Sequence, residues 1–100
     1  MTSGAIARLS AVAMQAIRAG DWPRAEQALR RLVKERGTPA EAAYNLAQVL
    51  LHRGRGEQAG PWLRRAVAQR PDYAIAWFEL GRWTLLHGAL DEARDAFARA

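Results

Sequence analysis

Side chains capable of catalysis or metal binding are few in this 100-residue sequence, and they are not spaced for either task. His52 and His87 stand near the ends of expected helices, with no carboxylate at ligand spacing beside them. An imidazole there stabilises the helix dipole, and we favour this reading over a metal site. The cluster of Asp91, Glu92 and Asp95 fits exposed acids in the first turn of a helix better than a catalytic pair.

Two further kinds of chemistry are excluded by the same inspection. The segment Gly54-Arg55-Gly56 lacks the context of a phosphate-binding loop. The sequence has no cysteine, which excludes disulfides and cysteine-ligated metal. We therefore expect no catalytic residue, no metal and no cofactor in these residues, which would not form an enzyme by themselves.

The last 27 residues, from Ala74 to Ala100, indicate the elements that position the remaining side chains. Trp77, Leu80 and Thr84 follow helical spacing, as do Ala93 and Phe97 further on. Gly88 stands between the two runs, where glycine commonly ends a helix because it accepts the left-handed conformation. The segment is predicted to be a helical hairpin.

The same pattern recurs at a distance of 34 residues. Leu80 corresponds to Leu46, Phe97 corresponds to Leu63, and the glycines at positions 20, 54 and 88 keep the same interval. A fixed period of this length indicates stacked repeats, each too small to bury its apolar face alone.

These residues resemble the tetratricopeptide repeat, whose pattern is W-x2-L-G-x2-Y, then A-x3-F, then P. The closest matches are Trp77-x2-Leu80-Gly81 and Ala93-x3-Phe97, and the second set is Ala43-x2-Leu46-Ala47, Ala59-x3-Leu63 and Pro71. The loosest set is Leu9-x2-Val12-Ala13 and Ala25-x3-Leu29, and Ala16, Leu50 and Thr84 replace the usual tyrosine.

The resemblance implies an all-α fold, a right-handed α-solenoid of three antiparallel helix hairpins. We expect a short tail at residues 1–5, repeats at 6–39 and 40–73, and an incomplete repeat at 74–100, with 6–100 forming one domain. The first helix is expected at about Gly4–Ala19, and the second is expected to run to about Arg36.

Helix starts have local signals of their own. Asp21 and Asp72 are expected to be N-caps, and Thr38-Pro39-Ala40-Glu41 reads as a capping box with proline at the first helical position. Gly56, Gly60 and Pro61 interrupt the fourth helix, which should therefore start late or be kinked.

The resemblance also implies a concave groove lined by the first helix of each pair, suited to an extended peptide or a docked helix. The lining positions in this sequence are Met14, Ile17 and Arg18, then Tyr44, Asn45, Gln48 and His52, then Ile75, Phe78, Glu79 and Arg82. The alternative is that these residues are solvated or packing residues without a dedicated ligand.

One ligand class of such repeats does not fit. The chaperone-tail clamp of the family holds a carboxylate with lysine, asparagine and arginine side chains. The matching positions here are Ser10, Met14, Asn45, Ile75 and Glu79. Only the asparagine is retained and Glu79 reverses a charge, so a carboxylate would be repelled.

Nucleic acid is a less favoured partner. The net charge is +5, and Arg31, Arg65 and Arg99 recur at the repeat period, beside Arg30 and Arg64. A convex arginine strip of this kind can bind phosphate. However, no aromatic side chains are interleaved with it, and a solvated helical face is the commoner explanation.

The sequence indicates a protein-binding scaffold, with a cytoplasmic location as the default. No apolar run is long enough for a membrane span, and the first ten residues do not read as a signal peptide. The chain stops inside the sixth helix, so we expect it to be the front part of a larger, bacterial-looking protein. The alternative is an accessory domain before a hydroxylase, sulfotransferase or glycosyltransferase.

The last hairpin has no following repeat to stack on. We expect Leu90 and Phe97 to close the hairpin internally, while Trp83 and Leu86 lie on the side of the fifth helix away from the second repeat. Exposed apolar side chains at this end would support weak self-association.

Overall fold

Glycine turns divide the chain where the repeat period predicts. Gly20, Gly54 and Gly88 have φ angles of 70°, 74° and 79°. They follow the long helices α1 (Thr2–Ala19), α3 (Ala40–His52) and α5 (Ala74–Leu86), respectively. A residue with a Cβ is strained in this left-handed region, so these three turns require glycine.

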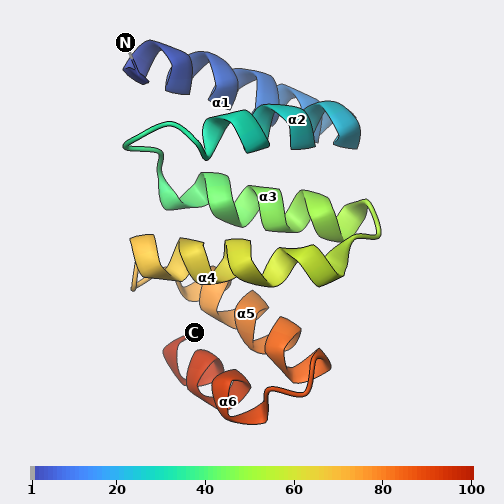
Figure 1. Ribbon diagram of the computed structural model, residues 1–100, viewed down its shortest axis with the longest axis vertical. Helices are drawn as coiled ribbons and strands as arrows, with labels where there is room; N and C mark the ends of the chain where they lie inside the picture. The colour runs from blue at the N-terminus through green and yellow to red at the C-terminus, as the bar shows by residue number, and fades with distance from the viewer. Residues whose placement is uncertain (1) are drawn as a thin grey trace.

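The computed structural model describes residues 2–100. The partners of the three long helices are α2 (Trp22–Leu32), α4 (Ala59–Gln69) and α6 (Leu90–Arg99), and a 3₁₀ turn, η1 (Gly56–Gln58), precedes α4. Consecutive helices stack one on the next along the longest dimension, which measures 40 Å (Figure 1). The fold is an all-α, right-handed solenoid of three hairpins, as predicted.

Two of the expected helix limits are wrong. The first helix begins at Thr2 and not at about Gly4, so residues 2–5 are helical and do not form a tail; Met1 lies outside the described residues. The second helix ends at Leu32 and not near Arg36. The Thr38 hydroxyl explains this end, because it donates to the carbonyl oxygen of Leu32 at 2.7 Å and holds the chain in a turn.

The cap predictions were right at one helix and wrong at two. Asp21 caps α2, since its Oδ1 accepts from the backbone N–H of Arg24 at 3.3 Å. The capping box at Thr38 does not form, because its hydroxyl is used by α2 and Pro39 takes the N-cap position of α3. Tyr73, and not Asp72, is the N-cap residue of α5.

The fourth helix starts late, as expected. The chain first makes η1, and α4 begins at Ala59, which leaves Pro61 in its first turn, where a missing N–H costs no helical hydrogen bond. Gly60 is also required here: a Cβ on it would come within 2.5 Å of the Trp83 ring.

The core consists of two clusters, one at each contact between hairpins. The first joins α1, α2 and α3 through Leu29, Leu46 and Leu50, each at most 1% exposed. The second joins α3, α4 and α5 through Leu63 and Leu80, with Ala96 of α6. We call the first contact junction one and the second junction two.

The last hairpin differs from the expectation. Trp83 points toward the second hairpin, where its Nε1–H donates to the carbonyl oxygen of Gly56 at 2.8 Å, so its expected place on the far side was wrong. The Phe97 ring covers Gly81, whose missing side chain leaves room for it. Leu90 is 63% exposed and does not close the hairpin, and Leu86 is 81% exposed, as expected.

Candidate functional site

The first helices of the three hairpins are linked by side-chain contacts along one face. Between α1 and α3, the Asn45 Nδ2 lies 3.9 Å from the Met14 sulfur. Between α3 and α5, the Gln48 Nε2 donates to Glu79 at 3.4 Å. Arg82, one turn further along α5, donates to the same Glu79 at 3.3 Å. We call this surface the first-helix face.

Tyr44 belongs to the same face. It is half-buried, and burial together with the nearby charge of Glu79 raises the pKa of its phenol. Its ring lies 5.4 Å from that of Tyr73, the residue before α5. The two rings fill the space between the N-terminal parts of α3 and α5, so Tyr44 contributes packing as well as surface.

The other expected groove residues are less closely gathered. The His52 ring stacks on Trp22 of α2 at 4.3 Å, and the Phe78 ring packs against Phe97 of α6 at 5.8 Å. Both therefore contact the second helix of a hairpin. Ile75 is 54% exposed, Arg18 is exposed and Ile17 packs against the first core cluster.

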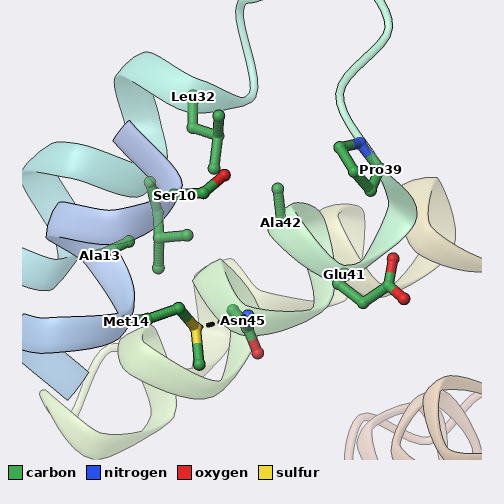
Figure 2. A pocket seen from close by; sticks show the side chains of 9 residues that line it. Ser10, Ala13, Met14, Leu32, Pro39, Glu41, Ala42 and Asn45 are labelled. Carbon is green, nitrogen blue, oxygen red and sulfur yellow. Dashed lines mark hydrogen bonds between the residues drawn. The ribbon is translucent and has the colours of Figure 1, made fainter. Parts of the chain in front are cut away.

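A pocket of about 170 Å³ opens on this face between α1 and α3 (Figure 2). We call it the α1–α3 pocket. Its floor is made by Leu29 and Leu32 of α2, and its walls are apolar apart from a few polar groups at the mouth. The remaining lining residues are Ser10, Ala13, Met14, Pro39, Glu41, Ala42 and Asn45.

This pocket was not predicted from the sequence, although the repeat period contains its signal. Ser10 occupies the position that Tyr44 and Phe78 hold in the later repeats. A small residue at an aromatic position of a repeat leaves space that the other repeats fill. Aligning the three repeats residue by residue would have shown it.

Three of the five arginines of the expected convex strip make hydrogen bonds within the protein, whereas Arg31 is exposed. Arg30 donates to Glu26 at 2.7 Å, and Arg64 donates to Glu92 at 2.8 and 2.9 Å. Arg65 donates to the carbonyl oxygen of Val33 at 2.6 Å. The bonds of Arg64 and Arg65 join one hairpin to the next, and the carboxylates paired with Arg30 and Arg64 partly neutralise the positive charge of the strip.

The most buried charge lies at junction one. The Glu26 side chain is 8% exposed and receives hydrogen bonds from Arg30, Arg53 and Arg55. Burial raises the pKa of its carboxyl, but the hydrogen bonds from Arg30 and Arg53 and the positive charges outweigh that, so the pKa lies below its usual value. Glu26 is therefore an ionised structural group that ties α2 to the end of α3.

The histidines have structural contacts that need no metal. His87 stacks on the Trp83 ring at 3.8 Å, and its Nδ1 lies 2.8 Å from the Trp83 carbonyl oxygen. His52 has the stack with Trp22 described above. In residues 2–100 no group of three possible metal-binding side chains comes together, and no helix there is long and apolar enough to cross a membrane.

Comparison with known proteins agrees with this architecture. The tetratricopeptide repeat model matches residues 13–74 and 63–100. Among solved structures, the crystal structure of MamA is similar, with a TM-score of 0.82 and 26% sequence identity. The match covers 94% of this chain but only 55% of the MamA chain. No curated protein matches.

Proposed function

This chain belongs to the tetratricopeptide repeat family, and from that premise we propose that its first-helix face binds a peptide or a helix of a protein partner. The family and the solenoid fold support a general role in protein–protein interaction. The observation that carries the finer proposal is the row of polar side chains Asn45, Gln48, Glu79 and Arg82, which runs from the second hairpin to the third beside exposed apolar residues, with Met14 of the first hairpin in contact with Asn45.

Such a surface has the two properties that peptide recognition needs. Its polar groups sit on helices whose backbones are fixed by the two cores, so they are held in place before a ligand arrives. Exposed Met14 and Ile75 add apolar area, and polar groups between them set the register of the bound segment. We propose no catalytic role for these residues.

The proposal is tested by selecting binders from a random peptide library displayed on phage against the immobilised chain. Gln48→Glu places a carboxylate against Glu79 and should weaken binding of the selected peptides at least about tenfold. Gln27→Glu, the same change at an exposed position of α2, is the control and should leave affinity unchanged. Equal binding to both variants would place the ligand elsewhere, and a selection that yields no binder would refute the function.

The role within a longer protein stays a prediction, as do the repeat limits 6–39, 40–73 and 74–100. The chain spans about half of MamA, so it is compatible with either a scaffold or an accessory domain of a bacterial enzyme. The sequence after Ala100 decides between them: further repeats support the scaffold, and a catalytic domain supports the accessory role. The cytoplasmic location also stays a prediction.

We also propose weak self-association at the last hairpin, through exposed leucines and not through Trp83. Leu85, Leu86 and Leu90 are 50%, 81% and 63% exposed, whereas Trp83 is engaged with α4 and η1. Sedimentation velocity over a range of concentrations should show a rising mass that the pair Leu86→Ser and Leu90→Ser abolishes. A concentration-independent monomer would contradict the proposal.

A further inference from the structure

The two junctions differ at one pair of positions on the first-helix face. At junction two, Tyr44 and Tyr73 bring their rings to 5.4 Å and fill the space where α5 begins. The residues 34 positions earlier are Ser10 and Pro39, at junction one. Both of these line the α1–α3 pocket. The pocket is therefore the place that an aromatic pair occupies in the next repeat.

The interior of the pocket is apolar and fixed. Leu29 and Leu32 at its floor are 1% and 3% exposed, and Ala13 and Ala42 in its walls are 1% and 4% exposed. All four belong to the first core cluster. Its volume of about 170 Å³ is slightly larger than the roughly 150 Å³ apolar cavity that is known to hold benzene. One side chain of leucine, methionine or phenylalanine size fits it.

The mouth of the pocket carries groups that can hold a peptide backbone. Figure 2 shows Asn45 and Met14 on one side of it and Ser10 on another. The Asn45 amide contacts the Met14 sulfur through Nδ2, and a thioether sulfur is a weak acceptor. An amide held this weakly exchanges its contact readily for a peptide carbonyl or N–H.

The charge at the mouth selects the neighbour of the apolar side chain. Glu41 is the one charged residue among the pocket's lining, and its Oε2 accepts from Arg70 at 2.8 Å. A carboxylate accepts several hydrogen bonds, so a second cation can bind its other oxygen. The lining itself supplies no cation for a terminal carboxylate, a phosphate or an acidic residue, and Arg70, which lies outside the lining, is already paired with Glu41.

We infer that the α1–α3 pocket receives one apolar side chain of leucine to phenylalanine size from an internal segment of the partner, next to a lysine or arginine that faces Glu41. This inference rests on the proposed function and names the partner's chemistry at one end of the same face. The second junction offers no equivalent site, because Tyr44 and Tyr73 fill it.

The test uses two synthetic peptides and the methyl signals of the intact chain. Acetyl-Gly-Ser-Leu-Lys-Ser-Gly-amide is the probe, and the same peptide with glutamate in place of leucine is its control. The chain has only two methionines, so the Met14 methyl signal has to be distinguished only from that of Met1. At millimolar concentrations, the leucine peptide should shift the methyl signals of Met14, Ala13 and Ala42 saturably, and the glutamate peptide should not.

A filled pocket provides the matched variant. Ser10→Tyr introduces at junction one the tyrosine that the second repeat has at the same position. This change should weaken binding of the leucine peptide at least about tenfold. Gln15→Tyr adds the same side chain to α1 outside the lining and should change nothing. Ser10→Val fills less of the pocket and should cause a smaller loss of peptide affinity. This second variant keeps the test decisive if circular dichroism shows that Ser10→Tyr folds poorly.

The outcomes separate this inference from the proposed function. The inference is overturned by equal shifts with both peptides, by no shift at all, or by a leucine peptide that binds Ser10→Tyr normally. If phage-selected peptides still bind the chain and lose affinity on Gln48→Glu, the function stands without the pocket. If that selection also fails, the function itself is wrong.

Discussion

Junctions one and two are built from the same repeat positions, but they differ at one of their two ends. At junction one the end near the start of α3 is open, and the end near the glycine turn is closed by Trp22 stacked on His52. At junction two the first end is closed by Tyr44 and Tyr73, and Trp83 fills the second over Gly60. A repeat therefore preserves its helices while single substitutions decide where its surface is open.

The two junctions also place their charges differently. Junction one buries Glu26 beneath three arginines, whereas junction two pairs Arg64 with Glu92 at the surface, where their side chains are 45% and 39% exposed. Only the first arrangement removes a carboxylate from water. Removing the Glu26 charge should therefore lower the free energy of unfolding more than removing the Glu92 charge.

The largest expected effect comes from the two tryptophans. Trp83→Ala should destabilise the chain by about 3 kcal/mol, because it empties the space over Gly60 and removes the bond to the Gly56 carbonyl. Trp22→Ala loses the stack on His52 and the packing of a half-buried ring against the first core cluster, and should cost about 1.5 kcal/mol. Urea unfolding measures both. Equal costs would show that the two turn ends are closed equally well.

The second effect concerns the carboxylates. Glu26→Gln leaves three arginines around an uncharged group and should cost about 2 kcal/mol at neutral pH, less than a fully buried pair because the arginines are about one-third exposed. Glu92→Gln, its counterpart at junction two, should cost about 0.5 kcal/mol. Chemical-denaturation midpoints measure both changes. A larger loss of stability in Glu92→Gln than in Glu26→Gln would contradict this expectation.

Acidification should remove the stabilising contribution of both carboxylates. The pKa of the Glu26 carboxyl is lowered on folding, so its contribution is complete above the unfolded pKa of about 4.3 and is lost as pH falls through the lower folded value. The hydrogen bonds from Arg64 lower the pKa of Glu92 in the same way. The stability difference between the parent and Glu26→Gln should shrink below about pH 4. A difference that is constant between neutral and acidic pH would contradict this account.

A smaller effect is expected from opening junction two. Tyr44→Ser copies Ser10 into the second repeat and removes the ring that packs on Tyr73, at a cost of about 1–2 kcal/mol. The variant should gain a second pocket, visible as new methyl shifts of Ala76 with the leucine peptide. If Ala76 does not respond, a small residue at this position is not enough to open a site, and Pro39 must contribute to the first one.

The sequence alone determined the fold and its periodicity. Helical spacing and the three glycines at the repeat interval are signals of this kind, because each acts on the backbone within a few residues. The same signals predicted the late start of α4 and the cap at Asp21. Such features depend on backbone geometry within a few residues, which a sequence states directly.

Only the tertiary structure decided which side chains meet across a junction. The direction of Trp83, the use of the Thr38 hydroxyl by α2 and the gathering of three arginines on Glu26 depend on contacts between residues far apart in the chain. The α1–α3 pocket is of the same kind, because a cavity exists only where two helices fail to fill the space between them. Ser10 is compatible with a helix surface anywhere; its effect comes from standing opposite Pro39, and that pairing is set by how the hairpins stack.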